Sequence, residues 1–455
     1  MPRVAKERFM ISYIKSFIFI LLFFTVLSVQ NPISASASEP EITISNGYDS
    51  KYLTDHSYYT NLELSGGTII RIDNATDVHS LYLEWDLGTN PNNKTVVNSG
   101  WYSGKPGVKP WILRINNVSY VYGKNGFLHE YVKLPDRSDV LEIIIPEGGA
   151  SIAGLSPLTE ETLPDWVQIW EQPHDTADLL VLSTHADDEI LFFGGTIPYY
   201  TKELGLKTQV VYFTYHTEKC RTHELLNGLY YCGVRNYPII GNHEDIYSTS
   251  LSHAKGLYNY NKALGFVVEL YRRFKPNVLV THDLNGEYGH GVHCLVADLA
   301  TKALELSNNP TAYPDSFRRY GLWDVKKAYL HLYATNPIDM EWEMDLTSYD
   351  GTNIWDVIRN AMNHYDSQLK YYGESITRNP NKVYDCTRFG LYRTTVGLDT
   401  GLCDFFENIP QGSYKSSLPH PVKKTYASAK SSDSGKITLS RSIGIQFQNL
   451  KGELQ

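Results

Sequence analysis

The chain has 455 residues, of which 42% are hydrophobic and 20% charged, an ordinary composition for a globular protein of two or more domains. Its formal net charge is −9 and no long basic run lies outside the N-terminus, which argues against a nucleic-acid partner. Five cysteines in a chain of this length do not make a disulfide-dense scaffold.

Residues 1–37 have the pattern of a secretory signal peptide. Basic residues precede an apolar core at 17–29, and Ala35-Ser36-Ala37 is an A-x-A cleavage signal. The core is shorter than the ~20 residues that a membrane-spanning helix needs. The alternative is an uncleaved anchor, which would be the protein's link to a membrane. We therefore expect a secreted or extracytoplasmic protein, which includes one associated with the cell surface or wall.

Residues 39–160 contain short strand-like runs separated by turn clusters, with no helical periodicity between them. This pattern predicts an all-β sandwich, an accessory domain similar in pattern to galactose-binding modules. Residues 161–175 form the predicted linker, in which the i, i+4 spacing of Trp166 and Trp170 favours a short helix that joins the two domains. The predicted strands are 41–44, 68–72, 81–85, 111–115, 119–122, 130–134 and 140–145.

The next domain, predicted for residues 176–410, begins with an apolar run at 179–182. The sequence His-Ala-Asp-Asp-Glu at 185–189 follows directly. A continuous apolar run predicts a strand buried on both faces of a parallel sheet, and ligands of such sheets bind beyond the carboxyl ends of the strands. A histidine and carboxylates at that position favour hydrolytic chemistry, and the alternative is a polar turn that leaves a core strand.

A second apolar run, at 278–280, leads into His282, Glu287, His290 and His293. The last two open a segment with helical spacing, so their i, i+3 separation places both imidazoles on one side of a helical turn. Neutral imidazoles and carboxylates are ligands of Zn²⁺, and a catalytic zinc keeps three protein ligands and a water. The two clusters together favour a zinc site.

Strands and helices alternate through the rest of this domain. Such alternation predicts βαβ units, and therefore an α/β domain with a Rossmann-like, mostly parallel sheet. Residues 411–455 are a tail of unknown structure, in which 443–447 is an apolar stretch suited to an extra strand. The predicted helices are 196–204, 257–274 and 354–370, and the further strands are 209–214, 278–281 and 328–333.

The paired clusters resemble the LmbE-like, PIG-L family of zinc-dependent N-acetylglucosamine deacetylases. The family motifs are HPDDE after the first strand and HxxH after a later one, and the resemblance covers roughly residues 176–410. Ala186 stands where proline is commoner, at a position that shapes the turn and ligates nothing. The matching residues here are His185, Ala186, Asp187, Asp188 and Glu189 in the first motif, and His290 and His293 in the second.

This resemblance implies roles for individual residues. His185, Asp188 and His293 would bind Zn²⁺, Asp187 would be the general base, and His290 would polarise the carbonyl or act as an acid. These residue types suit amide hydrolysis, because zinc activates water and a nearby carboxylate can take its proton.

Five more residues are weaker predictions. Arg221 and Glu224 resemble the family's R-x-x-E and would bind substrate hydroxyls or phosphate, although an i, i+3 salt bridge explains them equally well. His364 resembles a histidine found near the site, and the alternative is a solvent-facing residue. Glu189 and Glu287 would support the site from behind, and Glu189 also suits the N-terminus of a helix.

The sequence therefore predicts an exported, zinc-dependent N-deacetylase whose substrate is an N-acetylated amino sugar or glycan. One alternative is a sugar-binding protein whose hydrolase domain is inactive, but the presence of all five motif residues with an implied role argues against it, namely His185, Asp187, Asp188, His290 and His293. The other is a deacetylase of small metabolites of the GlcNAc-inositol type.

Overall fold

The computed structural model describes residues 38–86, 108–372, 376, 385–401, 403–410 and 412–416. The predicted signal peptide and most of the predicted tail lie outside these residues. Among the helices of the described part, none combines the length and the hydropathy needed to span a bilayer.

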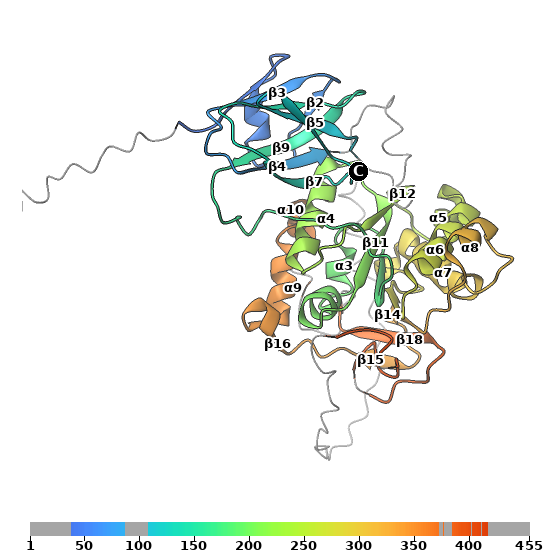
Figure 1. Ribbon diagram of the computed structural model, residues 1–455. Helices are drawn as coiled ribbons and strands as arrows, with labels where there is room; N and C mark the ends of the chain where they lie inside the picture. Colours follow the sequence, from blue (N-terminus) through green and yellow to red (C-terminus); the bar gives the residue numbers. More distant parts are fainter. Residues whose placement is uncertain are drawn as a thin grey trace, which may run out of the picture. The chain divides into compact units, whose positions relative to one another are not determined.

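The N-terminal region is all β (Figure 1), in two antiparallel sheets of order β1-β3-β8-β5-β6 and β2-β9-β4-β7. Strand residues alternate between buried and more exposed, as in β5, and the buried residues of both sheets belong to one hydrophobic core. The strands are β1 (Glu41–Ile44), β2 (Leu62–Leu64), β3 (Ile69–Asp73), β4 (Ser80–Asp86), β5 (Trp111–Ile115), β6 (Val118–Tyr122), β7 (His129–Lys133), β8 (Leu141–Ile144) and β9 (Ala150–Leu158), with a 3₁₀ turn η1 (Ser50–Leu53).

The structure has strands at all seven predicted positions of this region, and it has two more, β2 and β9. β9 reads ASIAGLSPL, so its small residues, glycine and proline disfavour a strand locally. It becomes a strand because it pairs with β4 on one side and β2 on the other.

The helix predicted around Trp166 and Trp170 is wrong. This segment is a loop, with Trp170 buried and Trp166 half exposed, so the two indoles do not share a face. Its backbone is bound elsewhere, because the amide of Ile169 donates to the Tyr230 hydroxyl and the amide of Glu171 to a carbonyl after α4. These contacts with the following domain override the local preference for a helix.

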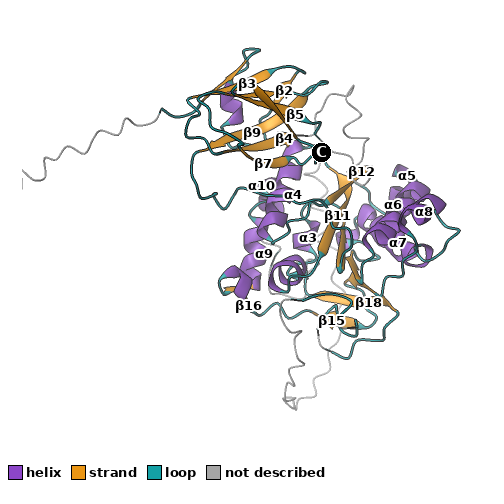
Figure 2. Cartoon of the chain, in the orientation of Figure 1, coloured by secondary structure: helices purple, strands orange, loops and turns teal. Residues whose placement is uncertain are grey.

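The second domain is α/β, which confirms the predicted class (Figure 2). Its seven-stranded sheet has the order β12-β11-β10-β13-β14-β18-β15, in which the first five strands pair in parallel and the last two add antiparallel pairs. The strands are β10 (Leu179–Ser183), β11 (Thr208–Tyr215), β12 (Ile239–Glu244), β13 (Val278–Thr281), β14 (Lys327–His331), β15 (Pro337–Asp339) and β18 (Arg388–Thr394); β16 (Asp345–Leu346) pairs with β17 (Thr352–Asn353).

Helices cover both faces of this sheet, which is why β10 is buried throughout. Leu180 and Leu182 pack with α5 to α7, whereas Leu179 and Val181 pack on the other side with α3, α4 and α9. The helical elements are α3 (Asp188–Leu191), η4 (Pro198–Glu203), α4 (Lys219–Tyr231), α5 (Leu251–Leu257), α6 (Tyr260–Phe274), η5 (Glu287–Gly289), α7 (Gly291–Leu306), α8 (Pro314–Tyr320), η6 (Thr347–Tyr349), α9 (Ile354–Met362) and α10 (Asp366–Tyr372).

The helix predicted at 354–370 is two helices, α9 and α10. The break coincides with long-range contacts. Tyr365 is fully buried with its hydroxyl on Glu189, and the amide of Ser367 donates to Glu224 at 2.8 Å. Both partners precede the break by more than 140 residues, so the local pattern cannot reveal it.

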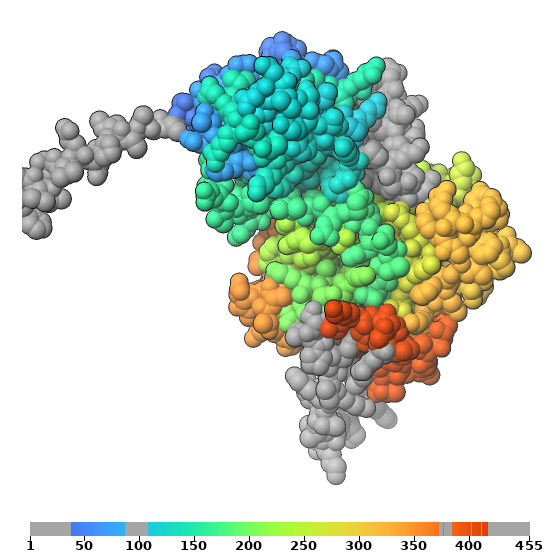
Figure 3. Space-filling model, in the orientation of Figure 1, coloured from blue at the N-terminus to red at the C-terminus, as the bar shows by residue number. Residues whose placement is uncertain are grey.

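The N-terminal domain packs on α4 through a buried polar network. His129 Nε2 lies 2.7 Å from His223 Nδ1, and His223 Nε2 lies 3.2 Å from Asp86 Oδ1. Lys219 Nζ donates to Glu63 at 2.8 Å. In the space-filling view the blue-to-cyan N-terminal domain meets the green segment of the α/β domain (Figure 3). α4 is therefore held from both domains.

The order of strands fixes where a ligand can bind. From β10 the chain adds β11 and β12 on one side, and it then returns to place β13 and β14 on the other. The carboxyl ends of β10 and β13 flank this switch point, where crevices form in open α/β sheets. The first motif begins two residues after the end of β10, and the second begins nine residues after the end of β13.

Candidate active site

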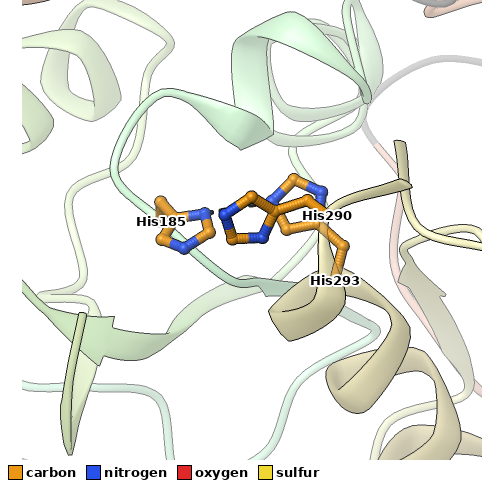
Figure 4. Close-up of side chains that lie close together, drawn as sticks. All are labelled: His185, His290 and His293. Atoms are coloured by element: carbon orange, nitrogen blue, oxygen red, sulfur yellow. Dashed lines mark hydrogen bonds between the residues drawn. The ribbon is translucent and has the colours of Figure 1, made fainter. Parts of the chain in front are cut away.

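Three of the predicted ligand side chains converge at this crevice. His185 follows β10, Asp188 begins α3, and His293 lies in the first turn of α7; all three are buried. His185 Nδ1 is 3.1 Å from Asp188 Oδ2 and 3.0 Å from His293 Nε2, and the third edge, from His293 Nε2 to Asp188 Oδ2, is 3.2 Å. The imidazoles of His185 and His293 face each other, with His290 beside them (Figure 4).

This triangle of atoms suits a zinc ion. Tetrahedral ligands at ~2.0–2.1 Å from zinc lie roughly 3.3 Å apart, close to the three edges observed. His185 Nδ1 and His293 Nε2 cannot both carry a proton at 3.0 Å, so at least one lone pair points into the triangle. Their other nitrogens face carboxylates: His293 Nδ1 forms a hydrogen bond with Glu287 at 2.7 Å, whereas His185 Nε2 lies 3.2 Å from Asp245 without hydrogen-bond geometry. Such partners place the proton away from a metal.

Glu287 is the centre of a buried hydrogen-bond cluster behind His293. Its Oε2 accepts from His293 and, at 2.9 Å, from His282 Nδ1, while its Oε1 accepts from His331 Nδ1 at 2.8 Å and from the Asp283 amide at 3.1 Å. Burial alone would raise the pKa of Glu287, but the imidazoles outweigh it and hold that pKa well below its usual value. Glu287 therefore lies where the predicted supporting role requires.

His282 also lies near the triangle, and together with Asp188 and His293 it offers a second set of atoms close enough for a metal. Its Nε2, however, accepts a hydrogen bond from the Thr184 amide at 2.9 Å, and its Nδ1 faces Glu287. With the Nε2 lone pair already bound, His282 connects the end of β13 to the end of β10 and does not complete the triangle.

Asp187 stands beside the triangle in a strained backbone conformation. Its φ of 113° and ψ of −30° lie in a region that residues other than glycine rarely adopt. Its amide donates to Glu189 Oε2 at 3.0 Å, and its Oδ2 lies 3.3 Å from Arg221 Nη2. Burial raises the pKa of Asp187, and the Asp188 carboxylate adds to this rise, while Arg221 opposes it. A carboxyl group of raised pKa beside a metal site is suited to proton transfer.

Glu189 supports this turn from beneath. It is fully buried, accepts from the Asp187 amide, and accepts a short hydrogen bond from the Tyr365 hydroxyl. Burial raises the pKa of Glu189 to about 8, and the Asp187 charge contributes to the rise. The side chain therefore contacts the backbone of the motif at Asp187.

His290 is the N-cap residue of α7, and its ring lies 4.9 Å from that of His185 and 4.6 Å from that of His293. These three imidazoles are also close enough to share an ion. Burial, followed by the two neighbouring imidazoles, lowers the pKa of His290 to about 2, so the ring is neutral. Its Nδ1 is buried without a hydrogen-bond partner among the described residues. The exposed rings of Tyr247 and Tyr288 flank the His290 ring, with ring centres 5.2 and 5.7 Å from its centre.

The three residues that were predicted to bind substrate lie in different places. Arg221 is buried and bonds the Ala186 carbonyl as well as facing Asp187, which brings it into the site. Glu224 accepts from the amide and hydroxyl of Ser367, at 2.8 and 2.6 Å, and so holds the start of α10. His364 follows α9 and lies against Tyr231. The structure thus places Arg221, but not His364, with the motif residues.

Sequence reasoning missed three residues of the site, namely His216, Asp245 and His331. Asp245 Oδ1 faces His185, and its Oδ2 lies 3.2 Å from His216 Nδ1; His216 Nε2 in turn accepts from the Ala186 amide at 3.1 Å. His216 and Asp245 follow β11 and β12 directly, and His331 ends β14. His216 lies just after the predicted strand 209–214, which was the available signal for it; no strand was predicted before Asp245, and His331 lies inside the predicted strand 328–333.

Comparisons with known proteins place the motifs in one family. Residues 180–304 match the family model described as "PIG-L: GlcNAc-PI de-N-acetylase". A 1D-myo-inositol 2-acetamido-2-deoxy-alpha-D-glucopyranoside deacetylase of Catenulispora acidiphila is 28% identical over 179 residues, which are 33% of this chain and 54% of the relative. An enzyme of the same name from Streptomyces avermitilis is 26% identical over 178 residues, 33% of this chain and 60% of the relative.

The chain thus spans between half and two thirds of the length of these curated relatives. Among solved structures, an N,N'-diacetylchitobiose deacetylase from Pyrococcus horikoshii is similar with a TM-score of 0.34 and 17% identity, over 45% of this chain and 77% of that one.

Proposed function

Because residues 180–304 form a PIG-L (LmbE-like) deacetylase domain, we propose that this protein is a zinc-dependent hydrolase that removes N-acetyl groups from an N-acetylated amino sugar. The observation that carries the proposal is the triangle of His185, Asp188 and His293 atoms, with edges of 3.0 to 3.2 Å, beside the buried carboxyl group of Asp187. It lies at the switch point of the sheet, within the matched segment.

His185, Asp188 and His293 would hold the metal, with Glu287 and Asp245 fixing the ring orientations of the two histidines. Bound zinc supplies Lewis acidity, which activates water and polarises a carbonyl. Asp187 takes a proton from the attacking water, because its carboxylate lies beside the triangle, its pKa is raised, and the other free motif carboxylate, Glu189, is engaged by the Asp187 amide and the Tyr365 hydroxyl.

Two further residues support the same reaction. Arg221 holds the Asp187 carboxylate in place through its Nη2. His290 is neutral, and its buried Nδ1 has no hydrogen-bond partner among the residues that the structure describes, so it is suited to bind the substrate carbonyl or the departing amine.

The substrate class has two candidates. The curated relatives are named as deacetylases of a GlcNAc-inositol compound, which favours a small metabolite. A glycan is favoured by the additional N-terminal domain, which packs on the helix that carries Arg221. A sugar-binding protein with an inactive hydrolase domain is less well supported, because the five motif residues are present and converge.

The test is an acetate-release screen of the zinc-loaded protein over a panel of N-acetylated substrates, from GlcNAc-inositol to oligomers and polymers of GlcNAc. Matched reactions use protein treated with a chelator and the Asp187→Asn variant. We expect release from at least one member that needs both zinc and Asp187. Zinc-loaded protein that releases no acetate from any member would refute the proposed activity.

Export is a separate proposal, supported by the signal-like pattern of residues 1–37. Cleavage after Ala37 would give a mature protein that begins near Ser38. N-terminal sequencing of exported protein is the measurement, and a sequence that begins at Met1 or Pro2 would contradict cleavage.

A further inference from the structure

A cleft lies where the N-terminal domain meets helices α4 and α10. It has a volume of about 800 Å³, within the range of ligand sites. The N-terminal domain supplies the segment before β2, α4 supplies its first turn, and α10 supplies most of its length. Its lining includes Tyr59, Asn61, Lys219, Ser367, Gln368 and Tyr371.

The cleft presents two aromatic rings to solvent, one from each domain. Tyr59 is 63% exposed and Tyr371 is 60% exposed. Amide groups of Asn61 and Gln368 lie on the same walls. A pyranose has an apolar C–H face and a rim of hydroxyls, so aromatic faces with amide neighbours match it. The lysines of the cleft are balanced by Glu218 and Asp366, which does not favour an anion.

One side chain separates this cleft from the proposed base. Ser367 lines the cleft, and its Oγ lies 3.4 Å from Arg221 Nη1. The other terminal nitrogen of the same guanidinium, Nη2, lies 3.3 Å from Asp187 Oδ2. The wall of the cleft is therefore joined to the proposed base through the buried guanidinium of Arg221.

The wall from the N-terminal domain and the wall from α4 are held together by direct contacts. Tyr58, next to Tyr59, accepts from Asn227 of α4 at 3.0 Å and donates to Glu84 of β4 at 2.8 Å. The Tyr58 ring also stacks on His223 of α4, with ring centres 4.4 Å apart. A cleft whose walls are joined by buried contacts is formed before the ligand arrives, so little ordering cost opposes binding.

We propose that this cleft binds sugar units that adjoin the N-acetylated unit, so that the substrate is an oligosaccharide or polysaccharide and the N-terminal domain supplies part of its binding site. The inference rests on the proposed deacetylase function for the choice of ligand. It assigns the glycan, rather than the small metabolite, as the preferred substrate.

The experiment compares GlcNAc with its β-1,4-linked pentamer as substrates. Tyr59→Ala and Tyr371→Ala should each lower kcat/KM for the pentamer about tenfold more than for the monomer, since truncation of a contacting tyrosine costs about that factor. Tyr48→Ala is the matched control, because Tyr48 is a half-exposed tyrosine of the same domain outside the cleft. Equal effects on both substrates, or no effect on either, would overturn the assignment.

A calorimetric titration of the pentamer into the zinc-loaded protein measures the affinity of the cleft for the sugar independently of turnover. We expect binding that both tyrosine variants weaken about tenfold and that Tyr48→Ala leaves unaltered. Absence of pentamer binding to the unmodified protein overturns the cleft assignment. Binding through the two tyrosines in a protein that releases no acetate would refute the proposed activity and retain the cleft.

Discussion

Replacing Glu287 with glutamine tests how far the site depends on one buried carboxylate. Glu287 accepts four hydrogen bonds, three from imidazoles and one from an amide. The amide of a glutamine at this position has one acceptor oxygen and one NH₂ group. The NH₂ group must therefore replace either the oxygen that faces His282 and His293 or the oxygen that faces His331. In the first case His293 must move its proton to the nitrogen that faces His185, and in the second two hydrogen bonds are lost.

Both arrangements weaken the site. Loss of an outer partner of a metal-binding histidine costs about 10–100-fold in metal affinity, and breaking a buried charged cluster costs about 3–5 kcal/mol of unfolding free energy. Glu287→Gln should therefore bind zinc at least about tenfold more weakly, measured by competition with a chromophoric chelator. The metal-free variant should also unfold at lower urea concentration.

The control is Glu305→Gln, which changes an exposed carboxylate on α7. A zinc affinity of Glu287→Gln within about twofold of the unmodified protein, far inside the expected loss, would show that Glu287 does not orient His293.

Three further predictions follow from the same geometry. Asp187→Asn should retain zinc and lose about 10²–10⁴-fold in kcat; retention of more than about a third of kcat, far inside that range, would assign the base elsewhere. Asp188→Ala should lose zinc together with activity, and full zinc occupancy by elemental analysis would remove Asp188 from the ligands. His129 is buried, and burial followed by His223 holds its pKa well below the usual value. Below about pH 6.5 the unfolded chain therefore binds a proton at His129 that the folded protein does not bind. Acidification below this pH lowers the free energy of unfolding by up to about 1.4 kcal/mol per pH unit, and above it the contribution of His129 is complete. Between pH 7 and 5 the free energy of unfolding, measured with urea, should fall less steeply in His129→Asn than in the unmodified protein. Equal pH dependence in the two proteins would contradict a neutral His129.

Local pattern was sufficient where chemistry restricts the residue types. The apolar run before His185 predicted a buried strand, and the i, i+3 spacing predicted His290 and His293 at one helix start, where His290 is the N-cap and His293 lies in the first turn of α7. Because parallel strands end at one edge of the sheet, the two motifs were expected to meet, and His185, Asp188 and His293 do.

The rest depends on partners far away in sequence. Asp245 and His216 have no motif around them, and they reach the site only because β11 pairs with β10 and β12 pairs with β11, so that all three strands end at the same edge of the sheet. The break between α9 and α10 is set by Glu189 and Glu224, which bind Tyr365 and Ser367 across the domain. Periodicity within one window contains none of this information.

The backbone of Asp187 has a consequence for how this protein can change. A residue with a side chain at φ 113° costs about 1–3 kcal/mol relative to glycine, so the reactive carboxylate is kept at the expense of the fold. Asp187→Gly and Asp187→Ala both remove the carboxylate, yet glycine should unfold at higher temperature than alanine, the reverse of the usual order. Selection for thermal stability alone would therefore favour loss of activity at this position, and the aspartate persists only while turnover is also selected.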